Sequence, residues 1–208
     1  MNSFLETIRV EQGRAHHLKL HQQRMAATIR EVYGDSAPVP SLEETLRDSV
    51  AIPDAGLYKC RVVYDSAIHR IELEPYTLRP VRSLRLVVAP VNLDYHLKRA
   101  DRCALAALAA GKDGCDEVII VRDGLVTDTS YTNLLFRTAD GRLLTPRTPL
   151  LPGTMRRHLL DAGLVSEADI TPCELVPGNC THITHALLIN AMMPLGRAPE
   201  IPVSAIVG

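Results

Sequence analysis

The 208-residue chain lacks an excess of charge of either sign, since 23 Lys and Arg residues stand against 24 Asp and Glu, for a formal net charge of −1. Nucleic-acid-binding domains usually carry a basic surplus, so nucleic acid is not an expected partner. No apolar run approaches the roughly 18 residues of a membrane span, and the N-terminus MNSFLETIRV has neither the basic start nor the apolar stretch of a secretory signal. We therefore expect a cytoplasmic protein without a membrane partner.

Cysteine is also scarce and is not arranged in pairs. The chain has five cysteines, an odd number, with no Cys-x-x-Cys spacing, which argues against a disulfide framework. Its eight histidines include His16, His17 and His21 in one group and His182 and His185 in another. Neither group has a cysteine or carboxylate at zinc-site spacing, so no metal is expected.

What the chain does contain is an ordinary share of apolar residues, 46 %, with 23 % charged residues, which favours a folded domain over a disordered one. Hydrophobic periodicity and turn residues predict short strands and short helices in mixed order, without an internal repeat. The pattern indicates two small α+β units: an N-terminal domain over residues 1–91, a connection over 92–97, and a second domain over 98–208.

Three features rise above this background. Lys98, in YHLKRADR, lies where the two units join, a favoured place for ligand clefts, although a lysine by itself also fits a solvated surface. The segment LVTDTSYTNLLF sets Asp128 among polar residues between two strand-like runs, as either a simple turn or a loop that presents a carboxylate. In TPLLPGTMRRHLL, Pro-Gly-Thr precedes a helix, as either a helix start or a phosphate site.

The order of these features resembles the class IV aminotransferase family, the pyridoxal-phosphate enzymes of fold type IV. The resemblance is carried by Lys98-x-x-Asp-Arg, DEVIIVRDGLVTDTSYTNLLF, GRLLTP and LLPGTMRRHLL, in that order. FLETIRVEQGRAHHLKLHQQRM is similar to the family's opening strand and its His-x-x-Arg helix, and LLINAMMP to a late phosphate-side segment. It implies an α+β fold like that of D-amino-acid aminotransferase, with a small N-terminal unit, a β-rich cofactor domain and pyridoxal 5'-phosphate as cofactor.

The resemblance also implies a role for individual residues. Lys98 would form the internal aldimine with the cofactor and, once displaced by substrate, would move the α-proton. Asp128 would face the pyridine nitrogen, where relatives usually carry Glu, and Arg24 would bind the phosphate through its planar fork. The remaining cofactor-binding positions would be Asn133, Thr154, Met155, Asn190 and Ala191.

Some positions depart from the family pattern. Met155 and Ala191 stand where many relatives carry hydroxyl residues, so backbone N–H groups would hold more of the phosphate. The tyrosine that branched-chain enzymes place after the lysine is replaced by Cys103, and the N-terminal unit is short. That unit usually shapes substrate specificity, so the substrate is the least determined part of the prediction.

Three functions remain open at this point. The first is an aminotransferase that acts on an amino acid or an amino-acid-like substrate. The alternative is 4-amino-4-deoxychorismate lyase, which releases p-aminobenzoate and pyruvate for folate synthesis; NAMMP and the missing tyrosine favour it. The third is a protein that kept the fold without catalysis, which the joint presence of Lys98, Asp128 and Arg24 opposes.

Lys59 and Arg61 share one strand face and either hold a substrate carboxylate or are solvated. A homodimer is implied by the family.

Overall fold

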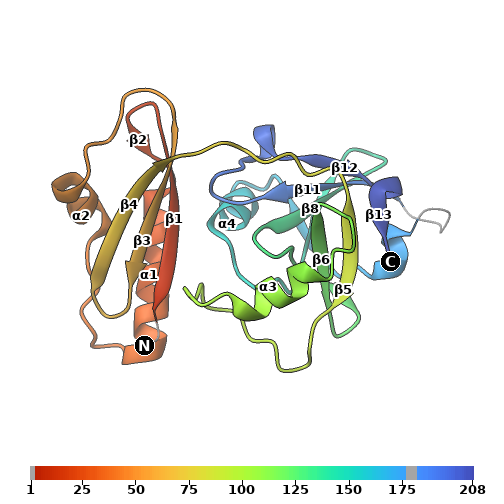
Figure 1. The fold of residues 1–208 in the computed structure, drawn as a ribbon, viewed down its shortest axis with the longest axis horizontal. Coiled ribbons are helices and arrows are strands. Elements are labelled where there is room, and N and C mark those ends of the chain that lie inside the picture. Colours follow the sequence, from red (N-terminus) through yellow and green to blue (C-terminus); the bar gives the residue numbers. More distant parts are fainter. Residues whose placement is uncertain (1–2, 177–181) are drawn as a thin grey trace. The chain divides into compact units, whose positions relative to one another are not determined.

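The computed structural model describes residues 3–176 and 182–208, and the chain divides into two compact units (Figure 1). Unit 1 comprises Met1–Leu78 and Leu97–Asp101, and unit 2 comprises Arg79–His96 and Arg102–Gly208. Residues 79–91 group with unit 2, where a strand in that stretch pairs, and residues 98–101 group with unit 1, so both stretches lie outside the domains expected for them. None of the helices in the described part of the chain is long and apolar enough to cross a membrane.

Unit 1 is an antiparallel sheet with helices against one face. The strands lie in the order β2-β1-β3-β4, and side chains alternate along β1 between the two faces. Phe4, Ile8 and Val10 of β1 pack with Met25 and Ile29 of the first helix in one buried cluster. The elements are β1 (Phe4–Glu11), β2 (Arg14–Ala15), α1 (Leu18–Tyr33), α2 (Leu42–Ser49), β3 (Leu57–Tyr64) and β4 (Ile68–Pro75).

Local sequence signals mark where the helices of unit 1 begin and end. The Ser41 hydroxyl accepts a hydrogen bond from the Glu44 N–H at 3.2 Å, so the Ser-x-x-Glu pattern marks the start of α2. Helix α1 ends at Gly34, whose positive φ of 94° is easily reached by glycine. Leu97–Asp101 return to this unit because the backbone at Phe4 bridges Arg99 in antiparallel fashion.

Unit 2 contains two further sheets. A five-stranded sheet has the order β10-β9-β8-β11-β12, and a four-stranded sheet has the order β13-β5-β6-β7. Apolar residues of both, among them Leu84, Ile119, Leu134 and Leu188, form one buried cluster. The strands are β5 (Leu84–Val88), β6 (Glu117–Arg122), β7 (Leu125–Val126), β8 (Asn133–Thr138), β9 (Leu143–Pro146), β10 (Ser166–Ala168), β11 (Ile183–Ile189), β12 (Glu200–Pro202) and β13 (Ile206–Val207).

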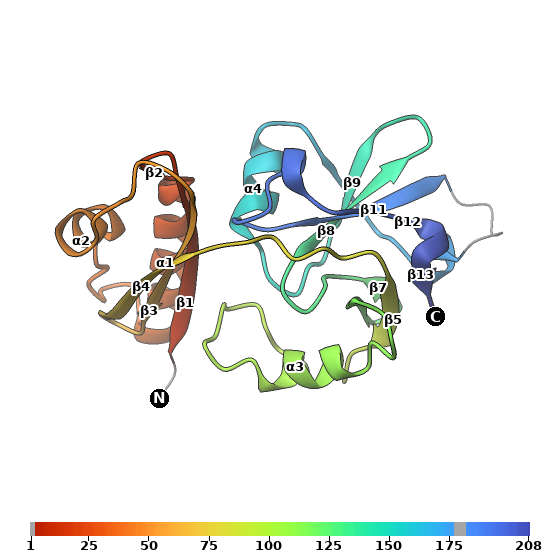
Figure 2. The ribbon, with the colours of Figure 1, turned by 45° about the horizontal axis from the view of Figure 1, so that its top comes forward.

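In the described part of unit 2, helices α3 and α4 accompany the sheets (Figure 2). Helix α3 (Cys103–Ala110) packs on β6 through Leu105, and helix α4 (Thr154–Asp161) packs on β8 and β11 through Met155 and Leu159. Short 3₁₀ turns occupy Pro172–Leu175, Leu195–Arg197 and Val203–Ala205. Mixed helices and strands in both units confirm the predicted α+β class.

Candidate active site

Asp128 is a buried carboxylate of unit 2. It lies between β7 and β8, with 4 % of its surface exposed. Oδ1 accepts from Asn133 Nδ2 at 2.8 Å, and Oδ2 accepts from the Leu151 N–H at 2.9 Å. Burial raises the pKa of Asp128 to about 6, against the lowering effect of these neutral donors. A positively charged N–H placed against this carboxylate would restore its ionised form.

Asn133 joins the Asp128 loop to the start of helix α4. Besides Asp128, its Nδ2 donates to the Leu151 carbonyl at 2.8 Å. Its Oδ1 lies so close to Gly153 that a Cβ built on the glycine would be 1.9 Å away. Gly153 has an ordinary φ of −72°, so the position requires glycine for close approach and not for its backbone conformation. Asn133 thereby holds the Asp128 carboxylate in place, and its predicted role in cofactor binding stays a prediction.

Thr154 and Met155 form the first turn of α4. The first N–H groups of a helix have no partner within the helix, and no side chain caps this one at Gly153. There is also no acidic residue in the first turn of α4. The Met155 side chain is buried with Leu135 and Leu159, which leaves its backbone as its polar contribution. Such a helix start suits a phosphate group.

Asn190 and Ala191 lie in the turn that follows β11. The Asn190 Oδ1 accepts from the N–H groups of Met192 and Met193, at 2.8 and 3.1 Å. Its Nδ2 donates to the Tyr131 carbonyl at 3.4 Å, which links this turn to the Asp128 loop. Ile189 pairs with Asn133 across the sheet. Unit 2 thus gathers its predicted cofactor residues around one end of β8 and β11.

Lys98 and Arg24 belong to unit 1. The Lys98 carbonyl accepts from the Leu5 N–H at 2.9 Å, so its backbone lies at the edge of β1. The next residue of β1, Glu6, accepts from Arg24 Nε at 2.9 Å and from Nη2 at 2.5 Å. Two of the five N–H donors of the Arg24 guanidinium are therefore directed at Glu6.

Glu6 and His21 are polar residues of this cluster that sequence reasoning missed. Both side chains are fully buried, and His21 Nδ1 lies 2.6 Å from Glu6 Oε2. Burial opposes ionisation of Glu6, but Arg24 and His21 outweigh it and lower its pKa to about 2. The signal was present in the sequence, because Glu6 occupies the same strand face as the buried Phe4 and Ile8.

Lys59 and Arg61 lie on β3, opposite Arg9 and Thr7 of β1. Their neighbours Cys60 and Val62 face the α1 core, so the two cations belong to the other face of the sheet. Lys59 Nζ lies 3.0 Å from Glu74, and Arg61 lies 3.8 Å from Glu72. Both side chains are about one-third exposed, at 31 % and 37 %. A role in binding a substrate carboxylate stays a prediction.

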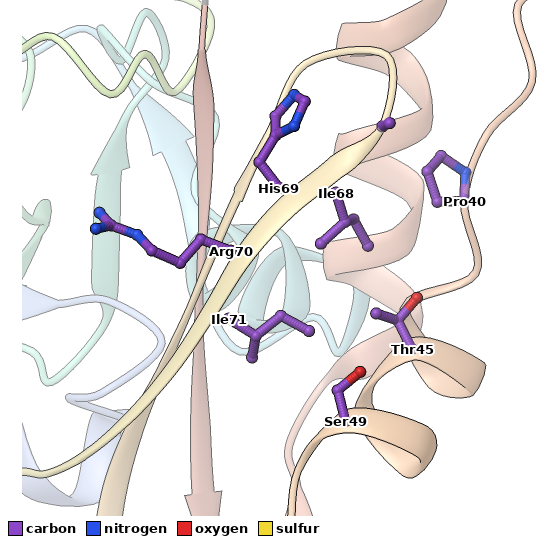
Figure 3. Close-up of a pocket in the computed structure, with 8 residues that line it drawn as sticks. Pro40, Thr45, Ser49, Ile68, His69, Arg70 and Ile71 are labelled. Carbon is purple, nitrogen blue, oxygen red and sulfur yellow. The ribbon is translucent and has the colours of Figure 1, made fainter.

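Unit 1 contains a cavity of about 480 Å³ (Figure 3). It opens between α2 and the start of β4, and Arg70 points away from α2 (Figure 3). None of the predicted site residues lines it; its lining consists of Pro40, Thr45, Ser49, Ala67, Ile68, His69, Arg70 and Ile71. Within residues 3–176 and 182–208, no three His, Cys, Asp or Glu side chains cluster as a metal site would require.

The observed side chains fit pyridoxal phosphate. The buried Asp128 carboxylate is held by neutral donors and is suited to a protonated ring nitrogen. The start of α4 offers uncapped N–H groups for a phosphate, and Arg24 is a partly exposed guanidinium fixed at one edge. Each feature complements one part of the cofactor: the ring nitrogen, or the phosphate.

Comparison with known proteins agrees with this chemistry. A Haemophilus influenzae protein named only as uncharacterized is 33 % identical over 193 residues, which cover 92 % of this chain and 98 % of that protein. A crystal structure from Haemophilus somnus 129pt, described as a candidate 4-amino-4-deoxychorismate lyase, is 32 % identical with a TM-score of 0.84 and covers 94 % and 98 % of the two chains. A Mesorhizobium loti structure, described as a candidate amino-acid aminotransferase, is 22 % identical with a TM-score of 0.76, covers 97 % and 99 %, and shows the shared fold.

The family itself follows from a match over nearly the whole chain. Residues 3–201 match the family described as Amino-transferase class IV. This confirms the family, the fold type and the enzyme class predicted from the sequence. The chain therefore belongs to the class IV aminotransferase family of enzymes, whose cofactor is pyridoxal 5'-phosphate.

Proposed function

We propose that this protein is a 4-amino-4-deoxychorismate lyase, which converts its substrate to p-aminobenzoate and pyruvate. The observation that carries this choice is the 32 % identical relative from Haemophilus somnus, which is described as a candidate enzyme of that activity and is matched over 98 % of its length. The Mesorhizobium loti structure named for an aminotransferase is 22 % identical, and supports the fold alone.

In this proposal Lys98 is the residue that joins the cofactor and afterwards moves the substrate proton. A lysine amine must lose its proton to act as nucleophile or base, and nearby cations lower the pKa of such a group. When bound, pyridoxal phosphate supplies an electron sink for the carbanion. Lys98 would remove the proton from the carbon that bears the amino group, so that the bond to the neighbouring enolpyruvyl oxygen breaks and the ring becomes aromatic. It could then give a proton to the departing enolpyruvate, which becomes pyruvate.

The other proposed site residues hold the cofactor: one group keeps its ring nitrogen protonated, and another binds its phosphate. Asp128 keeps the ring nitrogen protonated, and Asn133 keeps Asp128 in position through the 2.8 Å bond between them. Arg24 and the first N–H groups of α4, at Thr154 and Met155, hold the phosphate. The turn at Asn190 and Ala191 completes the phosphate side.

The substrate is proposed to be a small molecule with carboxylate groups, and Lys59 and Arg61 to bind one of them. The protein is further proposed to work in the cytoplasm as a homodimer, as the family resemblance implies. Analytical ultracentrifugation tests the dimer, and a fully active monomer would contradict it.

Amino-group transfer is the second candidate function, since the matched family is described by that activity. The two reactions share the first proton removal and differ in what leaves afterwards. Pyruvate release from 4-amino-4-deoxychorismate in the absence of any 2-oxo acid selects the lyase. Exchange of the amino group with 2-oxoglutarate or pyruvate, without p-aminobenzoate formation, selects the aminotransferase.

The shared part of the proposal has its own test. The purified protein should be yellow with pyridoxal phosphate, and borohydride should fix the cofactor to a peptide that contains Lys98. Lys98→Ala is the matched variant and should give no covalent adduct. A colourless wild-type protein that takes up no pyridoxal phosphate would contradict both enzymatic functions.

A further inference from the structure

A buried carboxylate in unit 1 is tied to the predicted phosphate ligand. Glu6 lies in β1 with no exposed surface, on the strand face that also carries Phe4 and Ile8. Both of its oxygens are engaged: Oε1 accepts from Arg24 Nε at 2.9 Å, and Oε2 from Arg24 Nη2 at 2.5 Å. Such a bidentate pair fixes the plane of the guanidinium as well as its position.

His21 is the third member of this cluster. It lies one turn before Arg24 on α1, and its Nδ1 is 2.6 Å from Glu6 Oε2. Burial lowers the pKa of His21, against the raising effect of Glu6, so the ring is neutral. Because an ionised Glu6 can only accept, Nδ1 carries the proton and donates it to the carboxylate. Nε2 is buried without a hydrogen-bond partner in the described chain.

A buried cluster of Glu6, Arg24 and His21 is not needed to stabilise the core of unit 1. Taking ions out of water costs free energy that their attraction often fails to recover, and apolar residues of similar volume commonly serve as well. Phe4, Ile8 and Val10 on the same strand face show that apolar side chains fit there. What a buried carboxylate adds is the orientation of Arg24, whose side chain is 13 % exposed.

We propose that Glu6 and His21 are positioning residues that hold the Arg24 guanidinium in the orientation that binds the phosphate of pyridoxal phosphate. Glu6 sets the plane of the guanidinium, and the His21 N–H keeps Glu6 from rotating away from Arg24. The inference rests on the phosphate role given to Arg24 in the proposed function.

The test compares two aldehydes that differ in the phosphate alone. Pyridoxal and pyridoxal phosphate would both join Lys98. The affinity for pyridoxal phosphate divided by the affinity for pyridoxal, called the affinity ratio, therefore isolates the phosphate contact. We expect Glu6→Gln to weaken pyridoxal phosphate about ten- to hundredfold, since charged hydrogen bonds and supporting contacts have effects of this size. Affinity for pyridoxal should change less than about twofold, because the proposal assigns the Glu6–Arg24 pair to the phosphate and not to the ring or the aldehyde.

Matched variants separate positioning from general damage. Glu11→Gln is the control on the same strand, since Glu11 pairs with Arg9, and it should leave the affinity ratio unchanged. His21→Leu should lower the ratio, and His21→Asn should restore it, because the asparagine amide can still donate to Glu6. The two His21 variants test the positioning role even if Glu6→Gln fails to fold.

Three results would overturn the inference. Equal losses for both aldehydes in Glu6→Gln would mean a structural role only, and so would equal ratios for His21→Leu and the wild type. A wild-type protein that binds neither aldehyde would instead remove the proposed function, and this inference with it. Absorbance near the cofactor band, read after equilibrium dialysis, reports all of these without any turnover.

Discussion

Replacing Gly153 by alanine should disturb the Asp128 site through a single methyl group. A Cβ at this position would lie 1.9 Å from Asn133 Oδ1 and 3.1 Å from its Cγ. Ordinary van der Waals contact begins at 3.4 Å, so either Asn133 or the start of α4 must move by 3.4 − 1.9 = 1.5 Å. Neither group can do so without losing contacts.

A rotation of Asn133 and a shift of α4 would each relieve this clash, and they lower the stability of the fold by similar amounts. If Asn133 rotates, its Nδ2 leaves both Asp128 and the Leu151 carbonyl, each 2.8 Å away. Losing one hydrogen bond to a charged group and one to a neutral group costs about 2–4 kcal/mol. If α4 shifts instead, overpacking costs about 1–3 kcal/mol, and the N–H groups of Thr154 and Met155 move with the helix. Cofactor binding weakens in either case.

Urea unfolding of the cofactor-free protein, followed by far-ultraviolet circular dichroism, measures the cost in a chain that has no tryptophan. Gly153→Ala should be less stable by about 2–3 kcal/mol. Gly196→Ala is the control, since a Cβ there meets nothing within 4 Å. In an Asn133→Ala background the penalty of Gly153→Ala should largely disappear. Wild-type stability and wild-type cofactor affinity in Gly153→Ala would refute the reasoning.

Three further results are expected. Because the pKa of Asp128 is raised from 3.8 to about 6 in the cofactor-free fold, its contribution to stability falls as pH rises through this window. The unfolding free energy of the wild type minus that of Asp128→Asn should therefore drop by about 2 kcal/mol between pH 4 and pH 7, and a pH-independent difference would contradict the raised pKa. Ser41→Ala should cost about 1 kcal/mol in urea unfolding through loss of the α2 cap, and Ser41→Thr should retain most of it. Arg61→Gln should raise KM for the carboxylate substrate about tenfold or more while leaving the cofactor absorbance unchanged; an unaltered KM would remove Arg61 from the substrate site.

Sequence periodicity predicted the longer elements of this fold because their signals are local. The Ser41 cap, the stop at Gly34 and the hairpin of β3 and β4 each depend on a few adjacent residues. Strand β12 has three residues and pairs with β11, across an irregular connection, and strand β13 has two residues and pairs with β5, far away in sequence. Stretches this short carry no periodicity of their own, so long-range pairing alone defines them.

The candidate site also combines contacts between residues close in sequence, which could be predicted, with contacts between distant segments, which could not. Asp128 and Asn133 are close in sequence, and their bond was within reach of motif reading. Gly153 was visible as part of a helix start, but its contact with Asn133 depends on how two distant loops pack. The role of Glu6 could not be predicted, because a carboxylate in an apolar strand looks like an irregularity in the apolar pattern. Only the fold brings Arg24 and His21 into contact with it.

The return of Leu97–Asp101 to unit 1 has a consequence for the order of folding. Leu97 belongs to the apolar cluster of the first sheet, and the Lys98 backbone pairs with Leu5. During synthesis, the first sheet therefore cannot acquire its last edge contacts until about twenty residues of the other unit have already left the ribosome. Among those residues is β5, which must wait longer still for β6. A fragment that stops at Leu78 would leave the edge of β1 at Leu5 uncovered, and so the two units are not separable as consecutive pieces of the chain.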